Sequence, residues 1–258
     1  MPPRSYIIAV VVLGALVGVS FFLNLGFSMT AWFWICAIAA CFLGVAGAFN
    51  IAEGLGSPRW IGVCLASPGL VWIFDNLHEW VQPTPGTSIK YEVFAAYFAM
   101  LAAGAGALKL VETMSRSHPA FRIGYALLAI MALWIANGFF ALTMEWRFFQ
   151  SPYYSIASRT LFAAGMTVEY GAFIAAAILI TIRHDVERWS CVAISLASSF
   201  LLYKRVYLLI MLRPPENIYF VYWLQPVLIL IGAAAVWRMG IILRGQASLK
   251  PLAHPSPA

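Results

Sequence analysis

Long apolar runs separated by short polar segments dominate the hydrophobic pattern of the chain. A hydrocarbon core about 30 Å thick is spanned by around 20 apolar residues in a helix. Runs of this length predict eight transmembrane helices, near residues 6–27, 31–53, 59–80, 92–113, 121–145, 160–182, 189–211 and 218–241. Because the connecting segments are short, the pattern predicts an all-α, polytopic transmembrane helix bundle without room for a second domain.

The composition supports the same class. Of the 258 residues, 62% are hydrophobic and 10% are charged, whereas a soluble domain carries roughly a quarter charged residues and about half apolar ones. We therefore expect an integral protein of a bacterial inner (plasma) membrane, surrounded by membrane lipids. A single domain over residues 1–244 and a disordered cytoplasmic tail over 245–258, rich in Pro, Ser and Ala, complete the predicted organisation.

The basic residues indicate an orientation. The net charge is +6, but the 16 Lys and Arg residues are scattered among the loops rather than gathered in a run. This pattern argues against a nucleic-acid partner, which requires clustered phosphate contacts. With the N-terminus in the cytoplasm, ten of the 16 basic residues fall on the cytoplasmic side. Since cytoplasmic loops normally carry the excess, we predict that both termini are cytoplasmic.

Part of the first half of the chain resembles a duplication. The segment AGAFNIAEGLGS (46–57) is similar to AGALKLVETMSR (105–116), and residues 61–76 are similar to residues 123–138. These matches predict a parallel hairpin repeat, in which the second and third helices correspond to the fourth and fifth. The alternative is a chance match between helices rich in Ala, Gly and Leu.

Three ionisable residues close the third predicted helix. Asp75, His78 and Glu79 have the i, i+3, i+4 spacing that places side chains on one helix face. His78 could act as a general acid or base oriented by a carboxylate. The alternative is a helix that ends in the headgroup layer. His78 is the one histidine within a predicted span and the cysteines form no CxxC pair, so we expect neither a metal site nor a cofactor.

Charged residues inside other predicted spans suggest a binding site. Glu169 lies about ten residues, hence about 15 Å, into its helix, at a depth where carboxylates usually face a cavity or a partner. Lys204 and Arg205 interrupt the seventh helix, and Ser195, Ser198 and Ser199 are predicted to extend a polar track from Arg205. Glu145, Arg147 and Arg159 stand at the same, outer side of the fifth and sixth helices. The alternatives are a hydrogen-bonded structural Glu169 and lysine or arginine side chains that extend to the interface.

Aromatic residues are concentrated on that outer side. They include Trp72, Trp80, Tyr91, Trp146, Phe148, Phe149, Tyr153, Tyr154, Tyr203, Tyr207, Tyr219, Tyr222 and Trp223. They suit an interfacial belt, or the wall of an outward-facing cavity built by the outer halves of the third, fifth, sixth and seventh helices.

Three functions fit these observations. The first is binding or transport of a small or amphipathic anionic solute, with Glu169 as a proton-linked group. The second is an intramembrane enzyme that acts on a lipid or isoprenoid-like substrate through His78 with Asp75 or Glu79. The third is a non-catalytic subunit or sensor module that works with partner membrane subunits.

Overall fold

A computed structural model describes residues 29–81, 88–115, 118–143, 155–211 and 218–249, without the side chains of 29–33, 75–81, 88–93, 141–143 and 218–223. Seven helices occupy these ranges: α2 (Met29–Gly54), α3 (Arg59–Val81), α4 (Ser88–Met114), α5 (Pro119–Thr143), α6 (Ile156–Arg183), α7 (Arg188–Met211) and α8 (Ile218–Leu249). No strand occurs in the described ranges. The all-helical class predicted from hydropathy is therefore confirmed.

Six of these helices are long and apolar enough to cross a membrane. The seventh, α3, has a shorter described apolar part, Arg59–Phe74. The predicted first span, 6–27, lies outside the described residues, so the count of eight stays a prediction. The helix α8 continues to Leu249, so residues 245–249, which we expected in a disordered tail, are helical.

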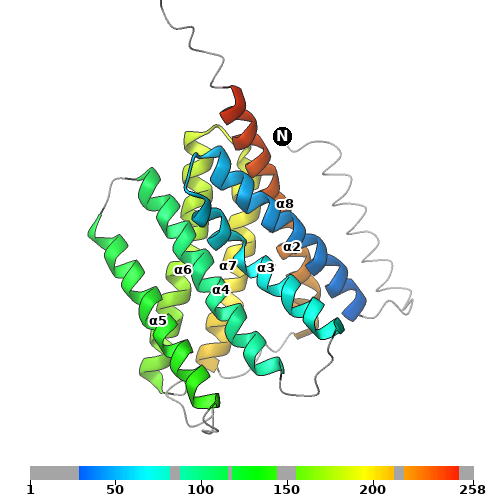
Figure 1. Ribbon diagram of the computed structural model, residues 1–258, viewed down its shortest axis with the longest axis vertical. Helices are drawn as coiled ribbons and strands as arrows, with labels where there is room; N and C mark the ends of the chain where they lie inside the picture. The colour runs from blue at the N-terminus through cyan, green and yellow to red at the C-terminus, as the bar shows by residue number, and fades with distance from the viewer. Residues whose placement is uncertain (1–28, 82–87, 116–117, 144–154, 212–217, 250–258) are drawn as a thin grey trace, which may run out of the picture.

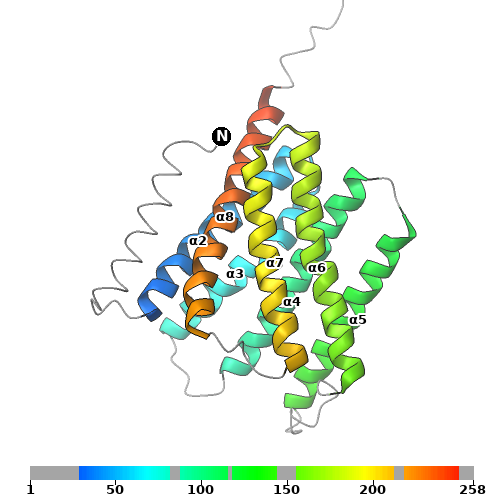
Figure 2. The same ribbon diagram turned by 180° about the vertical axis from the view of Figure 1, so that it is seen from behind.

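Six helices form a closed ring. Neighbours pack in the order α2, α3, α4, α6, α7, α8 and back to α2. Within the described part of the chain, α5 contacts α4 and α6 alone, and it stands at the edge of the bundle in Figures 1 and 2. Hence α3 is a member of the ring, whereas α5 is not. The two hairpins of the suggested repeat occupy different environments, and the repeat is not confirmed.

Glycines allow α2 and α8 to pack backbone against backbone. A Cβ atom added to Gly47 would lie 2.6 Å from the Trp237 nitrogen, and one added to Gly240 would lie 2.7 Å from the Gly47 carbonyl oxygen. In lipid, helices associate through such close packing because the hydrophobic effect does not distinguish a neighbouring helix from a lipid tail. The pair α2–α8 closes the ring.

A proline inside α3 leaves the helix continuous. Pro68 has no N–H group, so the Cys64 carbonyl loses its usual partner one turn earlier. The Ser67 hydroxyl is placed to replace it, at 2.6 Å from the Cys64 oxygen and 2.8 Å from the Ala99 oxygen of α4. The hydroxyl has one proton, which it donates to either carbonyl or shares between the two. The α3 helix is continuous through Pro68 and Gly69.

An ionic cluster joins α8 to the segment that precedes α7 and to the first turn of α7. Arg238 of α8 donates hydrogen bonds to Glu187, which precedes α7, with a shortest distance of 2.9 Å. The Trp189 indole donates to the same carboxylate at 2.6 Å. The hydrogen bonds from Arg238 are the main cause that lowers the pKa of Glu187.

Candidate functional site

The six-helix ring surrounds a lumen with two compartments. The larger has a volume of about 430 Å³ and the smaller about 280 Å³. Every helix of the ring contributes to both, and α5 contributes to neither. Six residues line both compartments and form the boundary between them: Leu65, Pro68, Met100, Tyr170, Leu201 and Ile229.

The two compartments follow each other along the bundle. On α2, the larger is lined by residues between 37 and 45, and the smaller by Ala48 and Ile51. On α7, which runs the opposite way, the larger is lined by Leu201 and Arg205 and the smaller by residues between 194 and 201. The lumen therefore extends from a Trp72 end to a Met239 end.

Arg205 gives the larger compartment its charge. The side chain lies in the wall, half-buried, with its guanidinium carbon 5.5 Å from the centre of the Tyr97 ring of α4. It interacts electrostatically with Glu169 and with the Tyr170 hydroxyl. An arginine stays protonated in proteins, so this compartment holds a fixed positive charge well inside the bundle.

Lys204 has a different role from its neighbour. Successive helix residues point about 100° apart, and Lys204 does not line either compartment. Its ammonium group donates a hydrogen bond to Gln225 of α8, a residue that does line the larger compartment. The structure thus separates the two cations that sequence reasoning treated together: Arg205 faces the lumen and Lys204 links α7 to α8.

Glu169 lies behind the wall of the lumen rather than in it. Its side chain is 2% exposed, and its Cγ is 2.8 Å from the place that a Cβ on Gly104 would take. The missing side chain at Gly104 therefore makes room for the carboxyl between α4 and α6. The Oε1 atom has no hydrogen-bond partner among the described residues, which leaves the electrostatic interaction with Arg205 as the link from Glu169 to the larger compartment.

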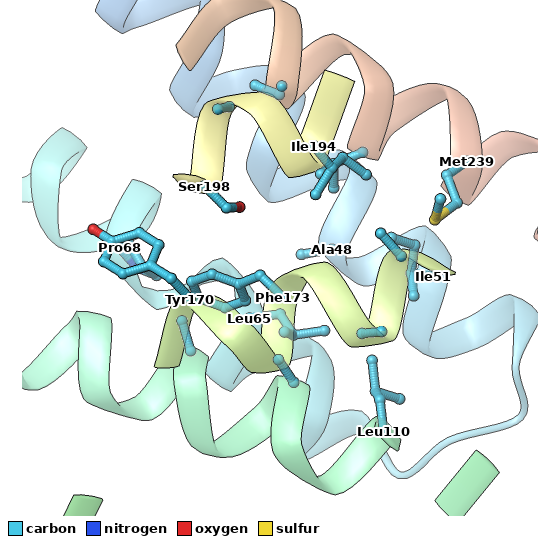
Figure 3. Close-up of a pocket in the computed structure, with 18 of the residues that line it drawn as sticks. Ala48, Ile51, Leu65, Pro68, Leu110, Tyr170, Phe173, Ile194, Ser198 and Met239 are labelled. Carbon is cyan, nitrogen blue, oxygen red and sulfur yellow. The ribbon is translucent and has the colours of Figure 1, made fainter. Parts of the chain in front are cut away.

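Tyr170 separates the compartments, and sequence reasoning missed it. Its ring packs edge-on against Phe173, with the ring centres 5.8 Å apart. In Figure 3 these two rings lie on one side of the smaller compartment and Ser198 on the other. The Tyr170 hydroxyl has no hydrogen-bond partner among the described residues, so its interaction with Arg205 lacks hydrogen-bond geometry. The sequence signal that could have pointed to Tyr170 is its place beside Glu169 within an apolar run.

Several sequence predictions are changed by this arrangement. The fifth helix, expected to help build the cavity, lies outside the ring, while α2, α4 and α8 line it. Of the three serines, Ser198 is buried and lines the smaller compartment, whereas Ser199 is exposed, so they form no continuous track from Arg205. Among the aromatic residues, Trp72 lines the larger compartment while Tyr203 is exposed.

The remaining predicted site residues lie mostly outside the described set. Asp75, His78 and Glu79 belong to the end of α3, but their side chains are not described. Glu145 and Arg147 fall in residues 144–154, which are also outside it. Arg159 is half-buried in the first turn of α6, and its Nε has no hydrogen-bond partner within the described ranges.

No match to known proteins accompanies this geometry. No protein-family model, curated protein or solved structure matches the chain. Among the described side chains, no group of three His, Cys, Asp or Glu residues could hold a metal ion. The lumen and the charges in and behind its wall therefore provide the basis for a function.

Proposed function

We propose that this integral membrane protein binds a small or amphipathic anionic solute in the lumen of the six-helix ring. The observation that carries the proposal is the place of Arg205, which lines the larger compartment with its guanidinium over the Tyr97 ring. Movement of the solute along the lumen would make the protein a transporter, since both compartments share one boundary lined by Tyr170.

The charge balance around Arg205 favours an anion. A cation within a membrane bundle is costly unless it is paired. The Tyr97 ring and the Tyr170 hydroxyl offer weak compensation, and Glu169 is held against Gly104 outside the lumen. An anionic group in the larger compartment would complete the pairing, and a guanidinium can bind a carboxylate or a phosphate through two parallel hydrogen bonds.

Glu169 provides a link to protons. Arg205 of α7 interacts electrostatically with it, Tyr170 follows it on α6, and the Tyr97 ring of α4 contacts the same guanidinium. An anion that binds Arg205 competes with the Glu169 carboxylate for the positive charge. Glu169 would then take up a proton from water. The total charge of Arg205, Glu169 and the bound anion would thus stay near its value before binding.

The number of membrane spans and their orientation are part of the same proposal. Eight spans with both termini in the cytoplasm would place the Met239 end of the lumen inside the cell and the Trp72 end outside. The excess of basic residues on the inner side supports this orientation. The lumen would then be outward-facing at its charged compartment, in a bacterial plasma membrane.

The other two functions receive less support. An intramembrane enzyme would depend on His78, Asp75 and Glu79, whose side chains lie outside the described set, so the described lumen adds nothing to that function. A non-catalytic subunit does not require a charged lumen, although it is compatible with one. Anion recognition is the function that the half-buried Arg205 in the wall of the lumen supports best.

The test compares charge removal at two adjacent positions. Parent, Arg205→Gln and Lys204→Gln proteins are placed in lipid nanodiscs, and binding of dodecyl phosphate and of dodecylammonium is measured against protein-free nanodiscs. We expect Arg205→Gln to weaken dodecyl phosphate binding by about thirtyfold or more, as for loss of one partner of a buried charge pair. Lys204→Gln, which removes a cation outside the lumen, should retain most of the affinity.

Two further readouts extend this test. Binding to the parent in weak buffer should remove protons from solution, and Glu169→Gln should abolish that uptake without abolishing binding. Equal binding of the anion and the cation, or equal affinity in parent and Arg205→Gln, would overturn the proposal. An unchanged proton count in Glu169→Gln would remove only the proton link.

A further inference from the structure

The smaller compartment has no role in the recognition of an anionic group. Of the described residues that line it, only Tyr170 and Ser198 carry a hydroxyl, amide or charged side chain. The others are apolar, and small residues such as Ala48, Ala177 and Gly232 create the space. Protein interiors are packed to the density of organic crystals, with few voids larger than a water molecule. A space of about 280 Å³ is therefore a large gap in the packing, with room for a ligand.

Water is a poor occupant of this compartment. An internal water molecule needs two to four polar partners, and large apolar cavities stay dry. Ser198 lies across the space from the Tyr170 and Phe173 rings (Figure 3), and Tyr170 also lines the larger compartment. An apolar ligand fits these walls better.

The shape of the compartment indicates the kind of apolar group. Its lining runs from Tyr170 to Ile180 on α6 and from Ile229 to Met239 on α8. Ten residues of a helix rise about 15 Å, which is about half of a hydrocarbon core about 30 Å thick. The compartment is therefore about as long as the apolar chain of one membrane lipid.

We propose that the smaller compartment holds the single apolar chain of an amphiphile whose anionic head is bound at Arg205. This inference rests on the proposed function, and it narrows the ligand to a single-chain anionic amphiphile such as an alkyl or isoprenyl phosphate or a fatty-acid-like carboxylate. The chain passes the boundary beside Tyr170, which lines both compartments.

The experiment varies the length of the ligand's alkyl chain while its phosphate head stays the same. Binding of butyl, octyl and dodecyl phosphate to the parent in nanodiscs is measured against the free aqueous concentration, with protein-free nanodiscs subtracted. We expect the affinity to rise by up to about fourfold for each methylene group, the increase that burial of one such group in an apolar site produces. The increase should stop once the compartment is filled.

A matched pair of protein variants tests where the alkyl chain of the ligand binds. Ala48 lines the smaller compartment and is 3% exposed, whereas Ala46, two residues away on α2, is exposed. Ala48→Phe fills the compartment and should weaken dodecyl phosphate binding at least tenfold while butyl phosphate binding is unchanged. Ala46→Phe should match the parent. If Ala48→Phe does not fold, Ala48→Leu gives the same comparison with a smaller effect.

The failures of the two proposals are distinguishable. If dodecyl phosphate binding depends on Arg205 but is equal in the parent and in Ala48→Phe, the chain stays in the surrounding bilayer; the inference is then wrong and anion recognition stands. The inference is also wrong if butyl and dodecyl phosphate bind the parent equally well. If the parent binds no alkyl phosphate at all, both proposals are overturned together.

Discussion

The two compartments of the lumen are built by the same six helices and differ in chemistry. The larger contains Arg205 and Gln225, whereas the smaller is lined almost entirely by apolar side chains. The difference depends on height along each helix rather than on which helix is used: on α7, Arg205 and Ser198 are about two turns apart. The chemistry of a membrane lumen is thus set by position along the bundle axis, and paired substitutions in the two compartments test that division.

The largest effect is expected from a new carboxylate in the apolar compartment. Ala177→Asp places one among apolar neighbours, and we expect it to lower the free energy of unfolding by about 3 kcal/mol, since a charge in an apolar membrane site costs at least this much. Gln225→Glu adds the same charge to the larger compartment, where Lys204 already contacts residue 225. It should be nearly neutral.

Unfolding of both variants can be followed by circular dichroism as sodium dodecyl sulfate is added to dodecylmaltoside micelles. Equal stability of Ala177→Asp and Gln225→Glu would show that the smaller compartment is hydrated. The chemical contrast between the compartments would then be wrong.

A smaller effect is expected where Glu169 is packed behind the lumen. Gly104→Ala adds a Cβ 2.8 Å from the Glu169 Cγ, and the overpacking should cost about 1–3 kcal/mol. Gly171→Ala is the control, because nothing lies within 4 Å of its Cβ position. In a helix this change should stabilise by about 0.5–1 kcal/mol, as the loss of glycine flexibility does.

The same detergent titration measures both glycine variants. If Gly104→Ala were as stable as Gly171→Ala, the close packing of Glu169 against α4 would be refuted. Nothing would then hold the Glu169 carboxyl outside the lumen.

The smallest effect concerns the ionic cluster beyond the apolar compartment. Arg238 lowers the pKa of Glu187 below its unfolded value of 4.5. A carboxyl with a depressed folded-state pKa stabilises the fold above the unfolded pKa, and this stabilisation is lost as the pH falls through the folded value. We expect the parent to lose up to about 1 kcal/mol below pH 4.5, as partly exposed ion pairs do.

Glu187→Gln should remove most of that dependence, because the amide does not titrate. His184, Asp185 and Arg188 lie nearby in sequence and stay unchanged in the variant. Unfolding midpoints at pH 7, 5 and 3.5 provide the measurement. An identical pH profile in the parent and in Glu187→Gln would assign the acid sensitivity to other carboxyl groups.

Sequence reasoning located the spans well and the site only in part. The expected span 189–211 corresponds to α7 at Arg188–Met211, because a membrane helix must be apolar along its whole length. Arg205 and Glu169 stood out because charge within such a span is costly. Tyr170, Tyr97 and Gln225 did not stand out, since aromatic and amide side chains also suit a lipid interface or a helix contact.

The helical membrane class, the approximate places of the described spans and the presence of Glu169 and Arg205 within them followed from the sequence alone. Only the tertiary structure decided that α3 belongs to the ring while α5 lies outside it, and that Arg205 faces the lumen while Glu169 lies behind its wall. The physical reason is that lipid and protein interior are both apolar. Hydropathy therefore shows that a helix lies in the membrane, and packing against its neighbours determines which face meets lipid, protein or the lumen.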